Sequence, residues 1–133
     1  MLALERGPCH GTCPVYGVKL FADGRVQFTG TRFVRPVGTD SARASVAAVA
    51  SLRDAFTSRK FGDIPATIEY NTATCGQYVA DLSTVVLTMH AGATSHTVRY
   101  DEGCRNHPMM LDTLARMVDS IGRTAQWTTA ARP

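Results

Sequence analysis

Apolar and polar side chains alternate with a period of two in several short stretches of the chain, which is typical of half-buried β-strands. In Val15–Phe21, Val18 and Leu20 share one face with Tyr16, while Lys19 lies on the other. Asp23-Gly24 follows this stretch and predicts a tight hairpin turn. The alternation predicts strands over residues 2–6, 15–21, 25–29, 84–90 and 95–100. Phe33 and Val34 are expected to extend the sheet after a break at Gly30.

Two later stretches repeat apolar residues every three or four positions, as one face of a helix does. Ser45 is the expected N-cap of the first helix, which should end near Lys60. Its apolar face consists of Val46, Val49, Leu52 and Phe56. Pro108 fits the first turn of the second helix, after a cap at Asn106 or His107, and the helix should run to about Gly122. Trp127 is expected to pack the tail back on the domain.

Two segments show neither period. Pro36–Ala44 is polar and small, which predicts a loop. Gly62–Asp81 is long and irregular, and loops of that length are often functional or held down by a cross-link. Tyr70, Tyr78 and Asp81 are therefore the candidates for a binding loop, and Cys75 is the candidate for the cross-link.

The order of elements predicts a two-layer α+β fold: hairpin, helix, loop, hairpin, helix. We expect an antiparallel sheet of about four to five strands with both helices on one face. Residues 1–133 are expected to form a single domain. The predicted core contains Val18, Leu20, Val49, Leu52, Phe56, Val86, Leu111, Leu114 and Val118.

Charge and hydropathy exclude several classes of protein. The formal net charge is +3 and the basic residues are scattered, so no nucleic-acid partner is expected. The longest apolar candidate, residues 42–50, is interrupted by Arg43 and two serines, so no transmembrane segment is expected. Met1 leads directly into Leu2-Ala3-Leu4, so the chain is expected to carry no signal peptide. The even number of cysteines, by contrast, favours an oxidising compartment.

Cys9 and Cys13 are held between two prolines, with Gly11 between them to let the chain fold back. Their spacing suits a disulfide, which the even cysteine count favours, or a two-thiolate metal clip. The Cys-x-x-x-Cys-Pro pattern also resembles the copper site of the cytochrome-oxidase assembly factors, although those proteins are thioredoxin-like and this strand order is not. A copper or zinc site would use Cys9, Cys13 and a histidine. The histidines that could complete it are His10, His90, His96 and His107.

Cys75 and Cys104 flank the second hairpin, and we expect them to be bonded to each other. In the chain-entropy treatment, closing a loop of that length stabilises by about 3.5 kcal/mol, against about 2 kcal/mol for the Cys9–Cys13 ring. The sequence has no zinc-protease, serine-hydrolase, phosphate-loop or dinucleotide motif, so neither a catalytic residue nor a cofactor is predicted. Asp101-Glu102 is expected to be a solvated acidic pair.

The segment Cys9-His10-Gly11-Thr12-Cys13-Pro14-Val15-Tyr16, followed by Asp23-Gly24 and Gly30, resembles the bacterial domain of unknown function 6438. The likeness extends over nearly the whole chain, through Cys75, Cys104 and Trp127. Members of that family are often secreted proteins or lipoproteins, so the resemblance implies the periplasm or the cell surface. We therefore expect a secreted or envelope-associated binding or structural module with a protein or envelope partner. The alternatives are an extracytoplasmic thiol-redox or copper/zinc-binding protein and, more distantly, a hydrolase.

Overall fold

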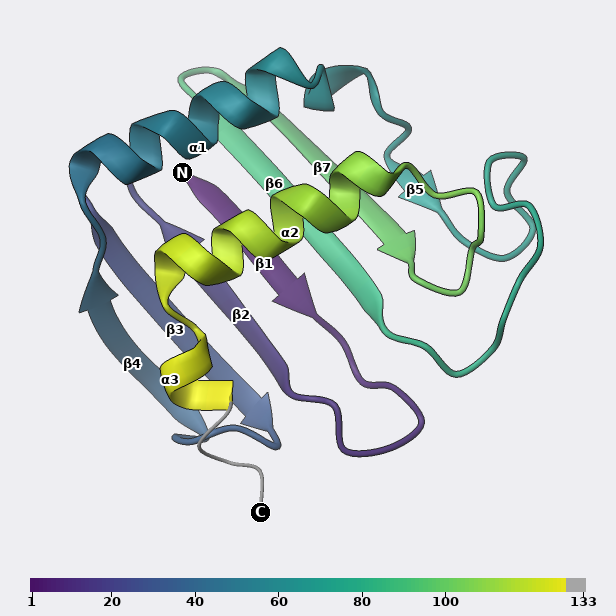
Figure 1. The fold of residues 1–133 in the computed structure, drawn as a ribbon, viewed down its shortest axis with the longest axis horizontal. Coiled ribbons are helices and arrows are strands. Elements are labelled where there is room, and N and C mark those ends of the chain that lie inside the picture. Colours follow the sequence, from purple (N-terminus) through teal and green to yellow (C-terminus); the bar gives the residue numbers. More distant parts are fainter. Residues whose placement is uncertain (129–133) are drawn as a thin grey trace.

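One sheet of seven strands runs through the molecule in the order β4-β3-β2-β1-β6-β7-β5 (Figure 1). The structure, a computed structural model, describes residues 1–128. The strands are β1 (Leu2–Arg6), β2 (Val15–Leu20), β3 (Arg25–Arg32), β4 (Gly38–Arg43), β5 (Thr67–Ile68), β6 (Thr84–Ala91) and β7 (Thr94–Asp101). Neighbouring strands are antiparallel except β5 and β7, which are parallel. The first strand, β1, therefore lies at the centre of the sheet.

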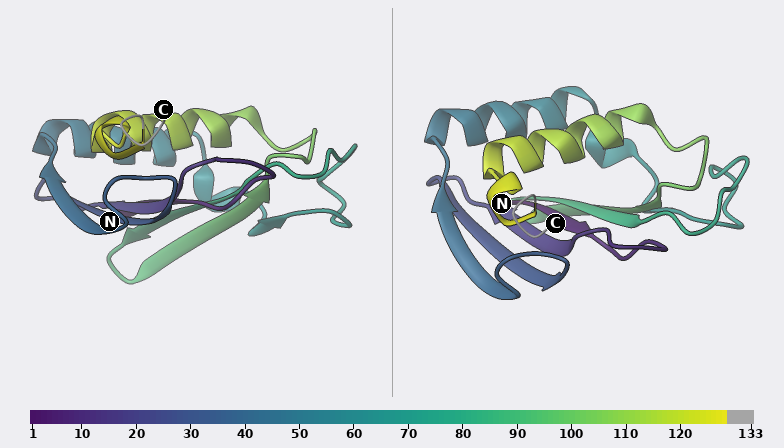
Figure 2. Two further views of the ribbon diagram at one scale, coloured as in Figure 1. Left: turned by 90° about the horizontal axis from the view of Figure 1, so that it is seen from below. Right: turned by 60° about the horizontal axis from the view of Figure 1, so that its bottom comes forward.

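The helices are α1 (Val46–Ser58), α2 (Met109–Gly122) and α3 (Ala125–Thr128), with a short 3-10 helix η1 (Phe61–Asp63). Both long helices lie side by side on one face of the sheet, as Figure 2 shows. The Ser45 side chain accepts a hydrogen bond from the Ala48 amide, so it caps α1 as predicted. Pro108, predicted inside the first turn of α2, is instead its N-cap residue. The structure thus confirms the α+β class.

The core fills the space between the helices and the covered face of the sheet. Leu4 of β1 pairs in register with Val18 on one side and Leu87 on the other, and all three are buried. The prediction that Val86 belongs to this core is wrong: Val85 and Leu87 face the helices, and Val86 lies on the opposite face. Thr84–Leu87 contains an unbroken run of β-branched and apolar residues, so its own pattern does not determine which side is inward.

The sheet has more strands than predicted and is mixed rather than wholly antiparallel. The predicted loop Pro36–Ala44 contains β4, an edge strand whose sequence has no apolar alternation because one face is exposed and Asp40 occupies the other. The irregular segment contains η1 and β5, which is only two residues long. Elements so short or so polar carry almost no periodic signal.

The predicted break of the sheet at Gly30 is also wrong, because β3 continues through it to Arg32. Gly30 is needed there for space: a Cβ atom at this position would lie 2.5 Å from Val34 Cγ2 and 2.6 Å from the Pro36 carbonyl oxygen. Phe33 then turns the chain with a φ of 55°, and Val34 returns to the core. The glycine therefore allows the β3–β4 turn to fold back against the sheet.

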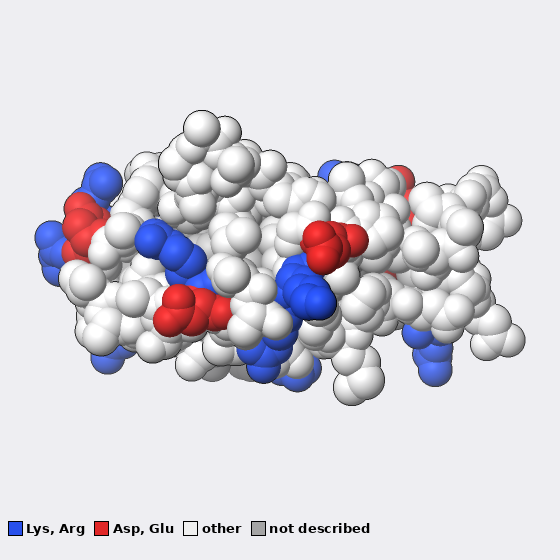
Figure 3. All heavy atoms as spheres, turned by 90° about the horizontal axis from the view of Figure 1, so that it is seen from above, with Lys and Arg blue, Asp and Glu red and all other residues white. Residues whose placement is uncertain are grey.

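Charges of both signs are mixed on the surface. Figure 3 shows one face of the molecule, on which blue and red atoms lie among each other without a continuous basic stripe. In residues 1–128, no helix has both the length and the apolar character needed to cross a membrane.

Candidate functional site

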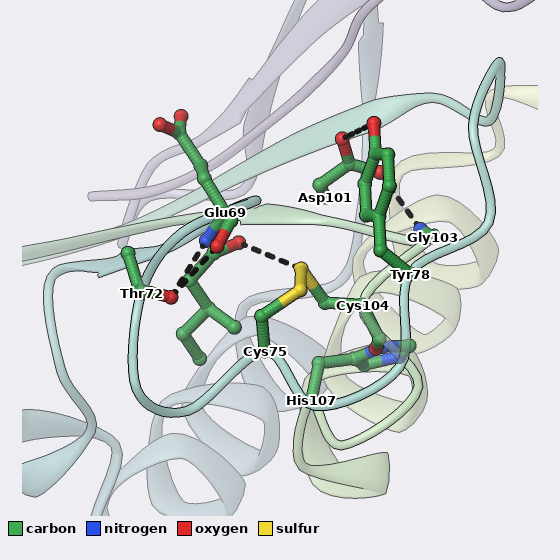
Figure 4. The surroundings of a disulfide bond; sticks show 9 residues. Glu69, Thr72, Cys75, Tyr78, Asp101, Gly103, Cys104 and His107 are labelled. Atoms are coloured by element: carbon green, nitrogen blue, oxygen red, sulfur yellow. Dashed lines mark hydrogen bonds between the residues drawn. A yellow bond between two sulfur atoms is a disulfide. The ribbon is translucent and has the colours of Figure 1, made fainter.

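The segment between β5 and β6, residues 69–83, is anchored by a disulfide, and we call it the stapled loop. Cys75 in this loop is bonded to Cys104, which follows β7, in the pairing that the sequence predicts (Figure 4). Both cysteines are buried, at 2% and 0% exposure. The bond thus anchors the middle of a long excursion against the end of the second hairpin.

Backbone hydrogen bonds add to this anchor. The Val79 amide donates to the Gly103 carbonyl at 2.9 Å, and the Arg105 amide donates to the Gln77 carbonyl at 2.8 Å. Gly103 makes this approach possible, because a Cβ atom there would collide with the Val79 carbonyl oxygen. The stapled loop is therefore fixed along its length, although it has almost no regular secondary structure.

Four large apolar side chains are nevertheless exposed on the stapled loop: Tyr70, Tyr78, Val79 and Leu82, at 63%, 37%, 44% and 46%. The rings of Tyr70 and Tyr78 lie 5.1 Å apart between centroids, tilted by 46°. The Tyr78 hydroxyl donates to Asp101 Oδ2 at 3.1 Å, and Figure 4 shows the two side chains pointing toward each other. That hydrogen bond, followed by partial desolvation and the negative charges of Asp101 and Asp81, raises the pKa of Tyr78.

Asp81, the third residue of the predicted binding loop, connects the stapled loop to the opening cysteine motif. Its backbone has a φ of 73°, and its carbonyl oxygen accepts a 3.0 Å hydrogen bond from the His10 amide. The Asp81 side chain is exposed. The structure thus brings the Tyr70–Tyr78 pair and Asp81 to the same end of the molecule, beside the loop that carries His10.

The opening loop contains the second disulfide, between Cys9 and Cys13. These two cysteines are partly exposed, and the His10 side chain between them is exposed as well. Bonded sulfurs cannot act as two thiolate ligands. Within residues 1–128, no three histidine, cysteine or acidic side chains are arranged to hold a metal ion. His96 and His107 are held elsewhere, by hydrogen bonds to Ile64 and to Cys104 with Asp112.

A partly buried polar cluster, which the sequence did not reveal, joins the opening motif to α2. Tyr16 donates to Asp119 Oδ1 at 2.5 Å, and Thr124 donates to the same oxygen at 2.6 Å. Arg6 donates to Asp119 Oδ2 through Nη2 at 2.8 Å and through Nε at 3.1 Å. Burial raises the pKa of Tyr16 above its usual range, and Asp119 adds to this. Burial alone would lower the pKa of Arg6, but Asp119 and Tyr16 outweigh it and raise the pKa.

A second cluster repeats this arrangement two helical turns away on α2. Tyr100 donates to Asp112 Oδ1 at 3.1 Å, and His107 donates to Asp112 Oδ2 at 2.7 Å and to the Cys104 carbonyl at 2.6 Å. Both partners of the imidazole are acceptors, so the arrangement favours the imidazolium form, in which both nitrogens carry protons. Burial opposes this charge, but the hydrogen bonds outweigh it and raise the pKa of His107. The cluster is suited to holding α2 on the sheet.

The face of the sheet away from the helices is uncovered and forms a shallow depression of about 880 Å³. Its floor contains the small residues Ala3 and Gly17, and Thr29, Val86 and Thr88 lie around them. Its side chains are mixed in character, and the described residues show no strongly apolar or single-sign patch there. We therefore take the stapled loop as the candidate site.

Fold and site define the class of the protein: a disulfide-stabilised two-layer α+β protein with an exposed aromatic loop. The family model described as a domain of unknown function (DUF6438) matches residues 1–122. The chain belongs to this family, as its opening motif predicted. A search of curated proteins finds no match.

Proposed function

We propose that this protein is an extracytoplasmic binding module, secreted or attached to the cell envelope, whose contact surface is the stapled loop. Two disulfides favour an oxidising compartment, because cytosolic thiols are kept reduced. A core cluster that draws on both hairpins and both long helices supports treating residues 1–133 as one module. No cofactor and no nucleic acid enter the proposal.

The observation that carries the proposal is the combination of exposure and immobilisation on the stapled loop. Tyr70, Tyr78, Val79 and Leu82 expose apolar surface although the backbone beneath them is fixed by a disulfide and an antiparallel pairing. Binding through such a loop loses little conformational entropy, because the backbone is already ordered. Contiguous exposed apolar side chains, tyrosines in particular, are typical of contact surfaces.

The test is site-specific photo-cross-linking in cells that produce the protein. A photoreactive amino acid at position 70 should form a discrete adduct, whereas the same residue at position 46 should not. Val46 is a matched control, because it is 58% exposed and apolar but lies at the start of α1. Equal labelling from both positions, or no adduct from position 70, would contradict the proposal. Fractionation of the same cells tests the envelope location.

A second candidate, a thiol-redox function of Cys9 and Cys13, is favoured by one observation. These cysteines are partly exposed, whereas Cys75 and Cys104 are buried, so a dithiol reductant reaches only the first pair without unfolding. Thiol titration of the native protein under mild reduction should then give two thiols. Tight copper(I) or zinc(II) uptake by that form, abolished by Cys13→Ser and weakened by loss of His10, would favour the metal alternative.

A further inference from the structure

The charges of the chain are unevenly distributed along the sequence. The protein has 14 lysines and arginines and a formal charge of +3, yet no lysine or arginine occurs between Lys60 and Arg99. The same stretch contains Asp63, Glu69 and Asp81. The stapled loop therefore forms a locally acidic part of a basic molecule.

The carboxylates lie where they act on the tyrosine pair. Asp101 Oδ2 is 3.1 Å from the Tyr78 hydroxyl, and Oδ1 accepts the Gly103 amide at 2.7 Å, so the carboxylate is held in place. Among the described residues, no hydrogen bond to the Asp81 carboxylate is recorded, and that side chain is exposed. Asp101 thus contacts the ring pair directly, and Asp81 lies near enough for its charge to act on Tyr78.

The nearest basic side chains cancel this acidity only in part. Arg99 is paired with Glu69 at 2.7 Å, and Arg6 is paired with Asp119 at 2.8 Å. Arg105 is exposed on the segment that pairs with Gln77, and its charge faces solvent with no ion pair recorded in residues 1–128. Asp81 and Asp101 make no ion pair in residues 1–128, so of these three arginines only the unpaired Arg105 offsets their two negative charges.

We propose that the stapled loop binds a lysine or arginine side chain of a partner protein, with the cation over the exposed faces of Tyr70 and Tyr78 and close to Asp81 and Asp101. This inference rests on the proposed function and specifies its ligand. An aromatic face attracts a cation through its quadrupole, and a nearby carboxylate adds to the attraction. The positive net charge of the rest of the molecule repels a basic partner, so charge complementarity favours binding at the stapled loop.

A protein partner is favoured over a small cation because of the remaining exposed residues. Val79 and Leu82, on the same loop as the tyrosines, also expose apolar surface. A lysine or arginine carries an aliphatic stem and is flanked by other side chains, which can bury these two residues while the charged group lies over the rings. An ammonium ion alone would leave both exposed.

The experiment follows the backbone amides of the isotopically labelled full chain by NMR during titration with short synthetic peptides. The probes are a peptide of alternating lysine and leucine, its arginine counterpart, and counterparts with glutamine or glutamate at the basic positions. Lysine and arginine peptides should shift amides of residues 69–82 and 101–106. The glutamine peptide should bind several-fold more weakly, and the glutamate peptide should not bind at the loop.

Variants with matched controls test each half of the site. Tyr70→Leu should weaken the binding of the lysine peptide by about two- to fivefold, the range for an exposed cation–π contact. Asp81→Asn should weaken the binding of the same peptide to a similar degree. Asparagine is chosen because it tolerates the positive φ of this position. Phe33→Leu, an exposed aromatic at 42%, and Asp54→Asn, an exposed carboxylate on α1, should change nothing.

Several results would overturn the inference while leaving the proposed function intact. One is equal binding of the glutamine peptide at the loop. A second is the failure of every basic peptide to shift the amide resonances of the loop. A third is a set of shifts produced by phosphatidylcholine vesicles and not by peptides, which would assign the surface to a lipid headgroup. Loss of the cross-link from position 70, in contrast, contradicts the proposed function itself.

Discussion

Tyr16, the last residue of the opening cysteine motif, donates a 2.5 Å hydrogen bond to Asp119 on α2, across 103 positions of sequence. Arg6, at the end of β1, donates to the other oxygen of the same carboxylate. The tyrosine that ends the segment Cys9–Tyr16 therefore joins the sheet to a helix. Its role in this structure is architectural, and the exposed part of the motif is the disulfide ring.

Replacing Tyr16 by phenylalanine should destabilise the protein by about 2 kcal/mol, because a hydrogen bond to a charged group contributes about 1.5–3 kcal/mol. Urea unfolding followed by circular dichroism measures the change. Tyr70→Phe is the control, since its hydroxyl lies on an exposed ring, and it should change the free energy of unfolding by less than about 0.5 kcal/mol. Equal effects of the two substitutions would contradict the architectural role.

The two disulfides should differ in their contribution to stability. Replacing Cys75 and Cys104 together by serine should lower the free energy of unfolding by about 3.5 kcal/mol, because that bond closes the longer loop of the unfolded chain. Replacing Cys9 and Cys13 together should cost about 2 kcal/mol. The melting temperatures of the two double variants show which disulfide contributes more stability. A larger decrease on removing the Cys9–Cys13 bond would contradict the prediction.

Trp127 should be essential for holding the chain after α2 against the sheet. It is 3% exposed, its ring stacks on Phe28 with centroids 4.4 Å apart, and its indole nitrogen donates to Asp40 at 2.8 Å. Trp127→Ala should therefore destabilise by about 3–5 kcal/mol, the range for a buried aromatic truncated to alanine. Trp127→Phe keeps the stacking and should lose less. Calorimetry compares the stability of the two variants. An unchanged melting temperature in Trp127→Ala would mean that the contact does not stabilise the fold.

Stability should decrease as the pH rises through neutrality because of His107. Its hydrogen bonds to Asp112 and Cys104 raise the pKa of the folded imidazole, against the opposing effect of burial. The stabilisation is then fully present below the unfolded value of about 6.5 and is lost as pH rises through the higher folded pKa. Glu102, whose pKa burial raises, contributes with the same sign.

Urea unfolding at a series of pH values from about 5 to about 9 measures this dependence. His107→Gln should flatten the curve in its upper half, and Glu102→Gln separates the carboxyl contribution. His10→Gln, at an exposed position in the opening ring, is the control. An unchanged curve in His107→Gln would assign the dependence to other groups.

The sequence predicted those features that repeat with a period. The strands with strong alternation and both long helices lie where expected, because the burial of one face imposes that period. Edge strand β4 escaped prediction because Asp40 is an exposed polar residue. It accepts a hydrogen bond from Trp127, a partner that only the folded chain brings near. Val86 was assigned inward because an apolar run lacks the alternation that distinguishes two faces.

The candidate site was predicted in part. Tyr70, Tyr78 and Asp81 lie in one irregular segment, so the length of that segment was enough to single them out. Arg6, Tyr16 and Asp119 are far apart in sequence and belong to three different elements. Their contact depends on β1 pairing with β2 and on α2 crossing both, which no local pattern contains.

The central position of β1 has a consequence for how the chain acquires its structure during synthesis. Leu2–Arg6 leaves the ribosome shortly before its β2 partner, but the β6 partner begins only at Thr84. Until then β1 has an open edge, and such edges pair readily with other chains. Contacts of this sequence separation also slow folding. The pairing that completes the centre of the sheet therefore forms late in synthesis, and a chaperone that covers the unpaired edge of β1 until then would keep that edge from pairing with other chains.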